Sequence, residues 1–253
     1  MILLCDVGNT HAHIGLGNRR RVMASLDLET RNLASPESRH RLEAWLAGQP
    51  IEGACFCSVV PAVVPQVMKL LSGTTHGPVL ALTFKTVLGV GIRYPKPETI
   101  GQDRLANAVA VRSLYGAPSV VVDFGTAVTF DVVDDRGDYV GGVIAPGLSA
   151  LTDYLHEKTA LLPKIKIREP RRVVGKSTEE AMLAGAVYGY RGLVREILGQ
   201  LTSAVGGPLP VVATGGYAQL IARKMPEITS VRPNLTLEGL RLTWLANRAT
   251  TCG

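Results

Sequence analysis

Residues 2–16, ILLCDVGNTHAHIGL, and residues 119–133, SVVVDFGTAVTFDVV, follow one pattern that decides the fold. Each stretch has an apolar run, an Asp-x-Gly turn at Asp6 or Asp123, and a second apolar run. Apolar runs on both sides of a glycine turn predict a β-hairpin. Asp123 follows Asp6 by 117 positions, close to half of the 253-residue chain. The repeat predicts a duplicated α/β unit whose two hairpin turns face one cleft.

The composition is that of a folded globular chain. Apolar residues make up 46% and charged residues 19%, which excludes a disordered protein. The net charge of +6 is a mild basic balance that suits an anionic ligand. The basic clusters Arg19–Arg21 and Arg168–Lys176 have no interleaved aromatic residues, so we expect no nucleic-acid partner.

The cysteines and the hydropathy of the chain indicate the cellular compartment of the protein. Four cysteines complete no zinc-binding pattern, and we interpret them as free thiols in a reducing compartment: Cys5, Cys55, Cys57 and Cys252. The N-terminus lacks the basic region of a signal peptide. The uncharged stretch Ile197–Ala222 holds too many glycines and prolines for a membrane span. We therefore expect a soluble, cytoplasmic protein with no membrane partner.

Periodicity between the two hairpins predicts further helices and strands. Helices are expected from Pro36, from Pro61 to about Leu71, over Gln102–Tyr115 and Gly147–Glu157, from Ser177 to about Leu201, and over Leu237–Asn247. Strands are expected at Ala54–Val60, Val79–Leu82 and Val211–Ala213, with a turn at Asp134–Asp138. Ser177 and Glu180 fit a capping box. Two domains are predicted, residues 1–115 and residues 116–253, each with one hairpin turn.

The paired turns are suited to phosphate groups. A glycine lets backbone N–H groups approach an anion, and Thr10 and Thr126 add hydroxyl donors. A carboxylate such as Asp6 or Asp123 repels a polyphosphate unless a cation lies between them, and Mg²⁺ is the simplest such cation. One Asp-x-Gly alone is also an ordinary structural turn, so only the pairing favours a nucleotide site.

Gly101-Gln102-Asp103-Arg104 begins a predicted helix, where an anion is favoured. Asp103 could accept the proton of a substrate hydroxyl, and the planar Arg104 side chain could bind a carboxylate. The structural alternative is an acidic first-turn residue followed by a surface arginine.

Together these motifs resemble the type III pantothenate kinases of the acetate and sugar kinase/Hsp70/actin superfamily. The matching stretches, in family order, are Asp6–Thr10, Tyr94-Pro95, Gly101–Asn107, Asp123–Thr129, Gly141–Gly147, Thr159–Pro163, Ser177-Thr178 and Thr214–Gly216. The resemblance implies two ribonuclease-H-like, actin-like ATPase domains with a cleft between them. It also implies ATP-dependent phosphorylation of pantothenate, the first step towards coenzyme A.

The resemblance further implies roles for individual residues. Asp103 would be the catalytic base, Asp6 would lie near Mg²⁺ at the phosphates, and Asp123 would bind K⁺ or NH₄⁺. The nucleotide site would comprise Asp6, Val7, Gly8, Asn9, Thr10, His11, Ala12, His13 and Thr126. The pantothenate site would comprise Tyr94, Gly101, Gln102, Asp103, Arg104 and Thr178. The family resemblance implies a homodimer with this site close to the interface.

Some residues depart from the family pattern. His11 and His13 share one face of a strand, which leaves open a metal pair or two solvated, phosphate-adjacent side chains. Phe124 replaces a small residue and is expected to alter packing behind the second turn. Two other functions stay open: a kinase for another small hydroxy acid, and a non-catalytic regulatory factor that binds nucleotide or pantothenate.

Overall fold

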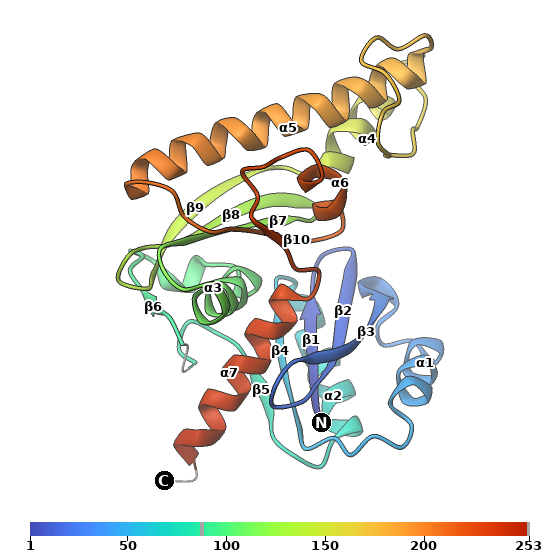
Figure 1. The fold of residues 1–253 in the computed structure, drawn as a ribbon. Helices are drawn as coiled ribbons and strands as arrows, with labels where there is room; N and C mark the ends of the chain where they lie inside the picture. The colour runs from blue at the N-terminus through green and yellow to red at the C-terminus, as the bar shows by residue number, and fades with distance from the viewer. Residues whose placement is uncertain (87–88, 252–253) are drawn as a thin grey trace. The chain divides into compact units, whose positions relative to one another are not determined.

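The computed structural model describes residues 1–86 and 89–251, with side chains for residues 1–86 and 89–248, and it divides into two compact units (Figure 1). Unit 1 comprises Met1–Gly116, Gly137–Val140 and Asn234–Gly253, and unit 2 comprises Ala117–Arg136 and Gly141–Pro233. The sequence prediction assigned all of residues 116–253 to the second domain. The C-terminal segment instead groups with unit 1.

Unit 1 is built on a five-stranded sheet of order β3-β2-β1-β4-β5. Its strands are β1 (Ile2–Val7), β2 (His11–Gly17), β3 (Val22–Glu29), β4 (Gly53–Ser58) and β5 (Val79–Ala81). β1 pairs antiparallel with β2 and parallel with β4, which confirms the first predicted hairpin. β3 was not predicted, because this edge strand is mostly exposed and has no continuous apolar run.

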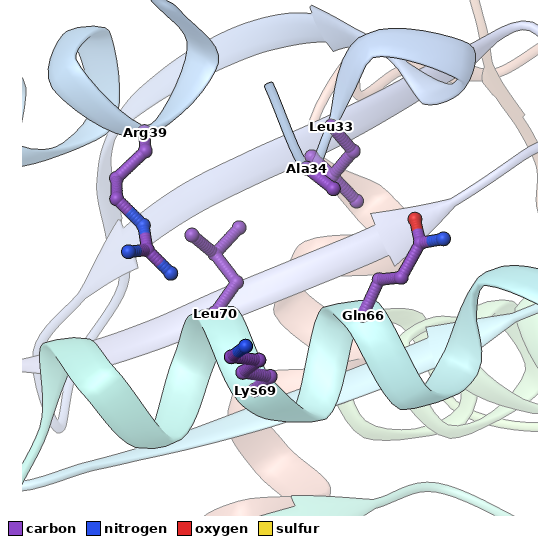
Figure 2. Close-up of a pocket in the computed structure, with 6 residues that line it drawn as sticks. All are labelled: Leu33, Ala34, Arg39, Gln66, Lys69 and Leu70. Carbon is purple, nitrogen blue, oxygen red and sulfur yellow. The ribbon is translucent and has the colours of Figure 1, made fainter. Parts of the chain in front are cut away.

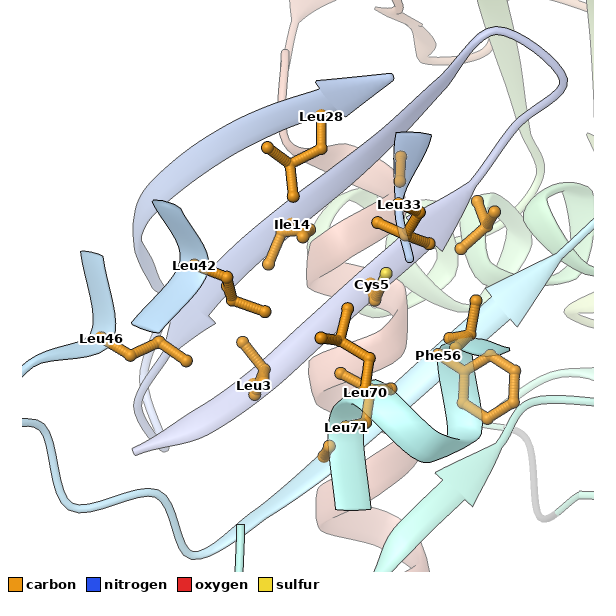
Figure 3. Close-up of a cluster of buried hydrophobic side chains, with 14 of the residues drawn as sticks. Leu3, Cys5, Ile14, Leu28, Leu33, Leu42, Leu46, Phe56, Leu70 and Leu71 are labelled. Atoms are coloured by element: carbon orange, nitrogen blue, oxygen red, sulfur yellow. The ribbon is translucent and has the colours of Figure 1, made fainter. Parts of the chain in front are cut away.

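Helices cover both faces of this sheet. Leu3 and Ile14 pack with α1 (Pro36–Leu46) and α2 (Val64–Thr74) in an aliphatic core, shown in Figure 3. Successive strand residues point to opposite faces, so Gly15 faces away from this core. On its side lies α7 (Leu235–Thr251), and a β-carbon on Gly15 would come within 2.7 Å of Leu237 Cδ1. α7 also packs against α3 (Gln102–Tyr115).

Unit 2 contains most of a six-stranded sheet of order β11-β10-β7-β8-β9-β6. The strands of this sheet are β6 (Gly91–Ile92), β7 (Ser119–Phe124), β8 (Ala127–Val133), β9 (Asp138–Pro146), β10 (Val211–Thr214) and β11 (Ser230–Val231). β6 belongs to unit 1. β7 pairs antiparallel with β8 and parallel with β10, just as β1 pairs with β2 and β4. The order β9-β8-β7-β10-β11 therefore repeats the order β3-β2-β1-β4-β5, which confirms the predicted duplication.

β9 and the two-residue β11 are the strands of the second copy that were not predicted, and β9 is the longer of them. Its first residues, Asp138 and Tyr139, group with unit 1 and pair with β6. Gly141, Gly142 and Pro146 lie within the strand and resemble turn residues in the sequence. The segment is nevertheless extended, because the neighbouring strand β8 supplies its backbone partners.

The helices of unit 2 are α4 (Leu148–Lys158), α5 (Thr178–Val205) and α6 (Ala218–Ala222). The Ser177 side chain caps α5 by accepting from the Glu180 N–H at 3.2 Å. The Glu180 carboxylate accepts from the Lys176 N–H at 2.7 Å, one residue before its partner in a capping box. Short 3₁₀ helices lie at η1 (Thr30–Asn32), η2 (Pro61–Val63) and η3 (Pro97–Thr99). No helix in the described part of the chain is long and apolar enough to cross a membrane.

A buried arginine anchors the irregular segment that precedes α5. The Arg191 guanidinium, 4% exposed, donates to both carboxylate oxygens of Glu169 at 3.1 and 2.7 Å. It also donates to the carbonyls of Leu220 and Ile221 at the end of α6. The hydrogen bonds and charge of Arg191, aided by Lys224, hold the pKa of Glu169 below its usual range despite partial burial.

Glu169→Gln should lower the free energy of unfolding at pH 7 by about 2–3 kcal/mol, because Arg191 would stay buried without a charged partner. A carboxyl with a lowered folded-state pKa stabilises the fold above its unfolded value and loses that contribution as pH falls through the folded value. The difference between the two proteins in urea unfolding should therefore shrink below about pH 4.5.

Glu196→Gln on the exposed face of α5 is the matched control and should change the free energy by less than about 0.5 kcal/mol. Equal losses for both variants at every pH would contradict the anchoring role of Glu169.

Candidate functional site

The first hairpin turn presents backbone groups at an exposed tip. Asn9, Thr10 and His11 are exposed, whereas Val7 and Ala12, which flank them, are buried. The Gly8 N–H donates to the His11 carbonyl at 3.0 Å across the turn. A β-carbon on Gly8 would lie 3.2 Å from that carbonyl, so the turn is tight around the glycine. This geometry leaves the tip open to an anion.

Asp6 sits in a polar row that crosses the sheet of unit 1. In register it faces His13 of β2 on one side and Cys57 of β4 on the other. Residues in register share a face, and Asp6 points away from the core around Leu3 and Cys5. The Cys57 thiol donates to Asp6 Oδ1 at 3.3 Å. The predicted Mg²⁺-side carboxylate is therefore oriented by a buried thiol.

Cys57 also lies near the predicted catalytic base. Burial raises the pKa of its thiol, and the charges of Asp6 and Asp103 raise that pKa further. The thiol is therefore protonated at neutral pH and acts as a donor. Asp6 of β1 and Asp103 of α3 thus both raise the pKa of one thiol. The sequence predicts for Cys57 only a free thiol, because nothing local to residue 57 indicates its neighbours.

Asp103 occupies the first turn of α3. Its Oδ1 accepts from the Arg104 N–H at 2.8 Å. Burial raises the pKa of the Asp103 carboxyl, while the N–H and the charge of Arg104 oppose the shift. A β-carbon on Gly101 would lie 2.5 Å from Asp103 Oδ1, so a larger residue here would displace this carboxylate. A desolvated carboxyl with a raised pKa is suited to general-base chemistry.

Two further contacts arrange the start of α3. Gln102 Oε1 accepts from the Ser58 N–H at 3.0 Å, which ties the helix to the end of β4. The Arg104 guanidinium lies 5.8 Å from the ring centre of Tyr139, and the Tyr94 ring lies 6.3 Å from the same ring. Tyr139 is buried, belongs to unit 1, and was not predicted. The structure therefore brings the predicted residues Tyr94 and Arg104 together through an aromatic ring.

His13 is held by protein groups on both sides of its ring. Its Nδ1 lies 2.5 Å from Asp27 Oδ1, and its Nε2 lies 3.1 Å from Asn234 Oδ1. His11 is exposed at the turn. Within residues 1–86 and 89–251, no cluster of three or more His, Cys, Asp or Glu side chains could hold a metal ion. The contacts of both His13 ring nitrogens with protein groups disfavour a metal pair of His11 and His13.

Two glycines, Gly147 and Gly215, lie against the second hairpin turn in unit 2. Gly215 has φ +88°, and a β-carbon there would lie 2.6 Å from Asp123 Oδ1. The Gly147 N–H donates to the Thr126 carbonyl at 3.2 Å. Phe124 is buried, and its ring centre lies 6.3 Å from that of Tyr190 in α5. Thr178 is exposed and begins α5.

A separate pocket lies between α1 and α2 (Figure 2). It is lined by Leu33, Ala34, Arg39, Gln66, Lys69 and Leu70. None of these is a predicted site residue, so this pocket is distinct from the turn and from the start of α3.

Five strands that follow the same order in both sheets define the duplicated ribonuclease-H-like fold. Among solved structures, the ethanolamine utilization protein EutJ from Carboxydothermus hydrogenoformans matches with a TM-score of 0.58 at 16% identity, over 95% of this chain and 89% of that chain. Component A of the (R)-2-hydroxyglutaryl-CoA dehydratase from Acidaminococcus fermentans matches with a TM-score of 0.52 at 14% identity, over 100% and 99%. These matches support the fold class alone.

Sequence comparison narrows the class to one family. Residues 2–200 match the family model of type III pantothenate kinase. The type III pantothenate kinase of Akkermansia muciniphila is 49% identical over 240 residues, 95% of this chain and 96% of that protein. That of Methylacidiphilum infernorum is 40% identical, over 95% and 87%. The chain belongs to the type III pantothenate kinase family.

The described cysteines should be unreactive in the folded protein. Cys5, Cys55 and Cys57 are free and buried, and burial raises the pKa of each thiol. Cys252 lies outside the described residues, so the test uses a Cys252→Ser variant. A chromogenic disulfide reagent at pH 8 should detect no thiol in the native protein and three after unfolding. Rapid release of one equivalent from the native variant would contradict this burial.

Proposed function

We propose that the chain transfers the γ-phosphoryl group of ATP to the hydroxyl of pantothenate. The product, 4′-phosphopantothenate, begins coenzyme A biosynthesis. Family membership over nearly the whole chain supports this reaction. The observation that carries the proposal for this molecule is the Asp103 carboxyl in the first turn of α3, which Gln102 ties to the end of β4, the strand next to Asp6.

Asp103 is proposed as the catalytic base. Phosphoryl transfer depends on positioning and on charge neutralisation, with a carboxylate accepting the proton of the attacking hydroxyl. Burial raises the pKa of Asp103, which makes its carboxylate a better proton acceptor than that of an exposed aspartate. Arg104 and Tyr94 are proposed to bind the pantothenate carboxylate and chain, together with Gly101, Gln102 and Thr178.

The nucleotide is proposed to bind at Asp6–His13 and at Thr126. Asp6 offers one carboxylate to a Mg²⁺ ion. Because the described residues form no cluster of three or more metal ligands, such an ion would be held mainly by phosphate oxygens and water. When bound, Mg²⁺ neutralises phosphate charge. Asp123, close to the carbonyl-rich turn at Gly125 and Thr126, is proposed to bind K⁺ or NH₄⁺.

A homodimer is also proposed, on the basis of apolar surface on unit 2. Leu151, Tyr154 and Leu155 of α4 are 37%, 61% and 40% exposed, and Leu161 beyond the helix is 90% exposed. Exposed apolar side chains grouped on one helix are typical of an interface rather than of a solvated surface. The buried thiols support a cytoplasmic location for the dimer.

Asp103→Asn should lower kcat by about 10²–10⁴-fold, because the base is lost. Activity of the unsubstituted protein should fall as pH drops through an apparent pKa above 3.8, since the base must be deprotonated and burial raises its pKa. The residual activity of Asp103→Asn should lack this acid limb. ADP release with ATP, Mg²⁺ and pantothenate measures both.

Asp135→Asn, on an exposed turn, is the matched control and should retain full activity. The assay is run with K⁺, NH₄⁺ or Na⁺, and the first two should support turnover. A folded protein that binds ATP but shows no pantothenate-dependent turnover would contradict the kinase proposal and favour the regulatory alternative.

Leu155→Asp should separate the proposed dimer, because a charge would be buried against apolar surface. Light scattering after size exclusion should give twice 27.0 kDa for the unsubstituted chain and 27.0 kDa for the variant. Lys158→Asp, at the exposed end of the same helix, serves as a charge-reversal control and should remain dimeric. A monomeric unsubstituted chain would refute the dimer.

A further inference from the structure

Thr30 lies behind the first hairpin turn and belongs to no predicted site. It follows β3 and begins η1, and it is only 4% exposed. Asn9, Thr10 and His11 at the tip of the turn are exposed. Thr30 therefore contacts the turn from its buried side, and a ligand at the tip would not touch it.

Thr30 makes two hydrogen bonds to this turn. Its hydroxyl donates to the Gly8 carbonyl at 2.7 Å. Its backbone N–H donates to the Thr10 carbonyl at 3.0 Å. The buried Thr30 thus binds two carbonyls of the turn at Gly8–His11, those of Gly8 and Thr10.

The hydroxyl takes the place of a bond that would close the turn. Gly8 and His11 lie opposite each other just beyond the last pair of the β1–β2 ladder, which is Val7 and Ala12. In such a position each N–H can donate to the opposite carbonyl. Gly8 donates to His11, but the hydrogen bonds of the described chain include none from the His11 N–H to the Gly8 carbonyl. That carbonyl accepts from Thr30 instead.

These contacts set the direction of two peptide groups. In a planar trans peptide, the C=O of one residue and the N–H of the next point in opposite directions. With the carbonyls of Gly8 and Thr10 directed at buried Thr30, the N–H groups of Asn9 and His11 are directed away from it. Carbonyl oxygens repel an anion and N–H groups attract one, so this orientation favours anion binding.

We propose that Thr30 is a positioning residue that orients the Asn9 and His11 amides towards the phosphate groups of the nucleotide. This inference rests on the proposed function only in taking the turn at Gly8–His11 as a phosphate site. The Thr30 hydroxyl, which lies outside the turn, would then raise the affinity for the phosphate groups and leave the affinity for the nucleoside unchanged.

Thr30→Val tests the proposal, because valine has the shape of threonine, keeps the backbone N–H and lacks the hydroxyl. The probes are Mg·ATP, inorganic tripolyphosphate and adenosine, titrated calorimetrically into the full chain. Loss of one neutral orienting hydrogen bond should weaken binding of Mg·ATP and tripolyphosphate about three- to tenfold and leave adenosine within about twofold. Thr30→Ser, which restores the hydroxyl, should recover phosphate affinity.

Thr75→Val is the matched control. Thr75 is also buried in unit 1, and its hydroxyl donates to the Ile51 carbonyl at 3.1 Å, but it does not contact the turn. It should leave all three affinities unchanged. If Thr30→Val does not fold, Thr30→Cys replaces it, with a weaker donor and a smaller expected loss.

Three results would overturn the proposal: unchanged phosphate affinity in Thr30→Val, an equal loss for adenosine, or no affinity of the unsubstituted chain for Mg·ATP and tripolyphosphate. The expected binding pattern without pantothenate turnover would refute the proposed kinase reaction and leave the role of Thr30 standing.

Discussion

The pairing of β1 between β2 and β4 is the constraint on which the site in unit 1 depends. This pairing places Asp6 in register with His13 on one side and Cys57 on the other, on the face opposite the aliphatic core. The same face receives α3, whose first turn carries Asp103 near the Cys57 thiol. A shift of one residue in register would turn Asp6 into the apolar core, where a carboxylate without a partner is costly. Core packing thereby determines where the polar row lies.

A second set of residues orients these groups. Cys57 donates to Asp6, Thr30 engages the carbonyls of Gly8 and Thr10, and Gly101 leaves room for the Asp103 carboxylate. Preorganised donors and acceptors are valuable in phosphoryl transfer because little covalent chemistry is left for the protein. In unit 2, glycines have the corresponding role, since Gly215 lies against Asp123 and the Gly147 N–H donates to the Thr126 carbonyl. Side-chain hydrogen bonds therefore support the first hairpin turn and glycines lie against the second, although the strands around both follow the same order.

Some elements of the fold follow from residues that are close together in the chain, and others depend on a neighbouring strand. Both hairpins, the helix at Gln102 and the Ser177 cap follow from alternation, turn glycines and capping residues, and the structure confirms them. β3 was missed although Ala24, Leu26 and Leu28 alternate with polar residues, because the strand is mostly exposed and follows a basic turn. β9 was missed because Gly141 and Gly142 resemble turn residues. In both cases the neighbouring strand supplies the order that the local sequence does not specify.

The sequence by itself determined the duplicated α/β pattern, the two Asp-x-Gly turns and the acidic residue at the start of a helix. These features depend on side chains within a few positions of one another, so periodicity and turn chemistry reveal them. Only the tertiary structure decided that Cys57 orients Asp6, that Tyr139 joins Tyr94 to Arg104, and that His13 lies between Asp27 and Asn234. Asp6 and Cys57 are 51 positions apart and His13 and Asn234 are 221 apart. Strand register and helix packing bring such residues together, and no local pattern in the chain specifies either.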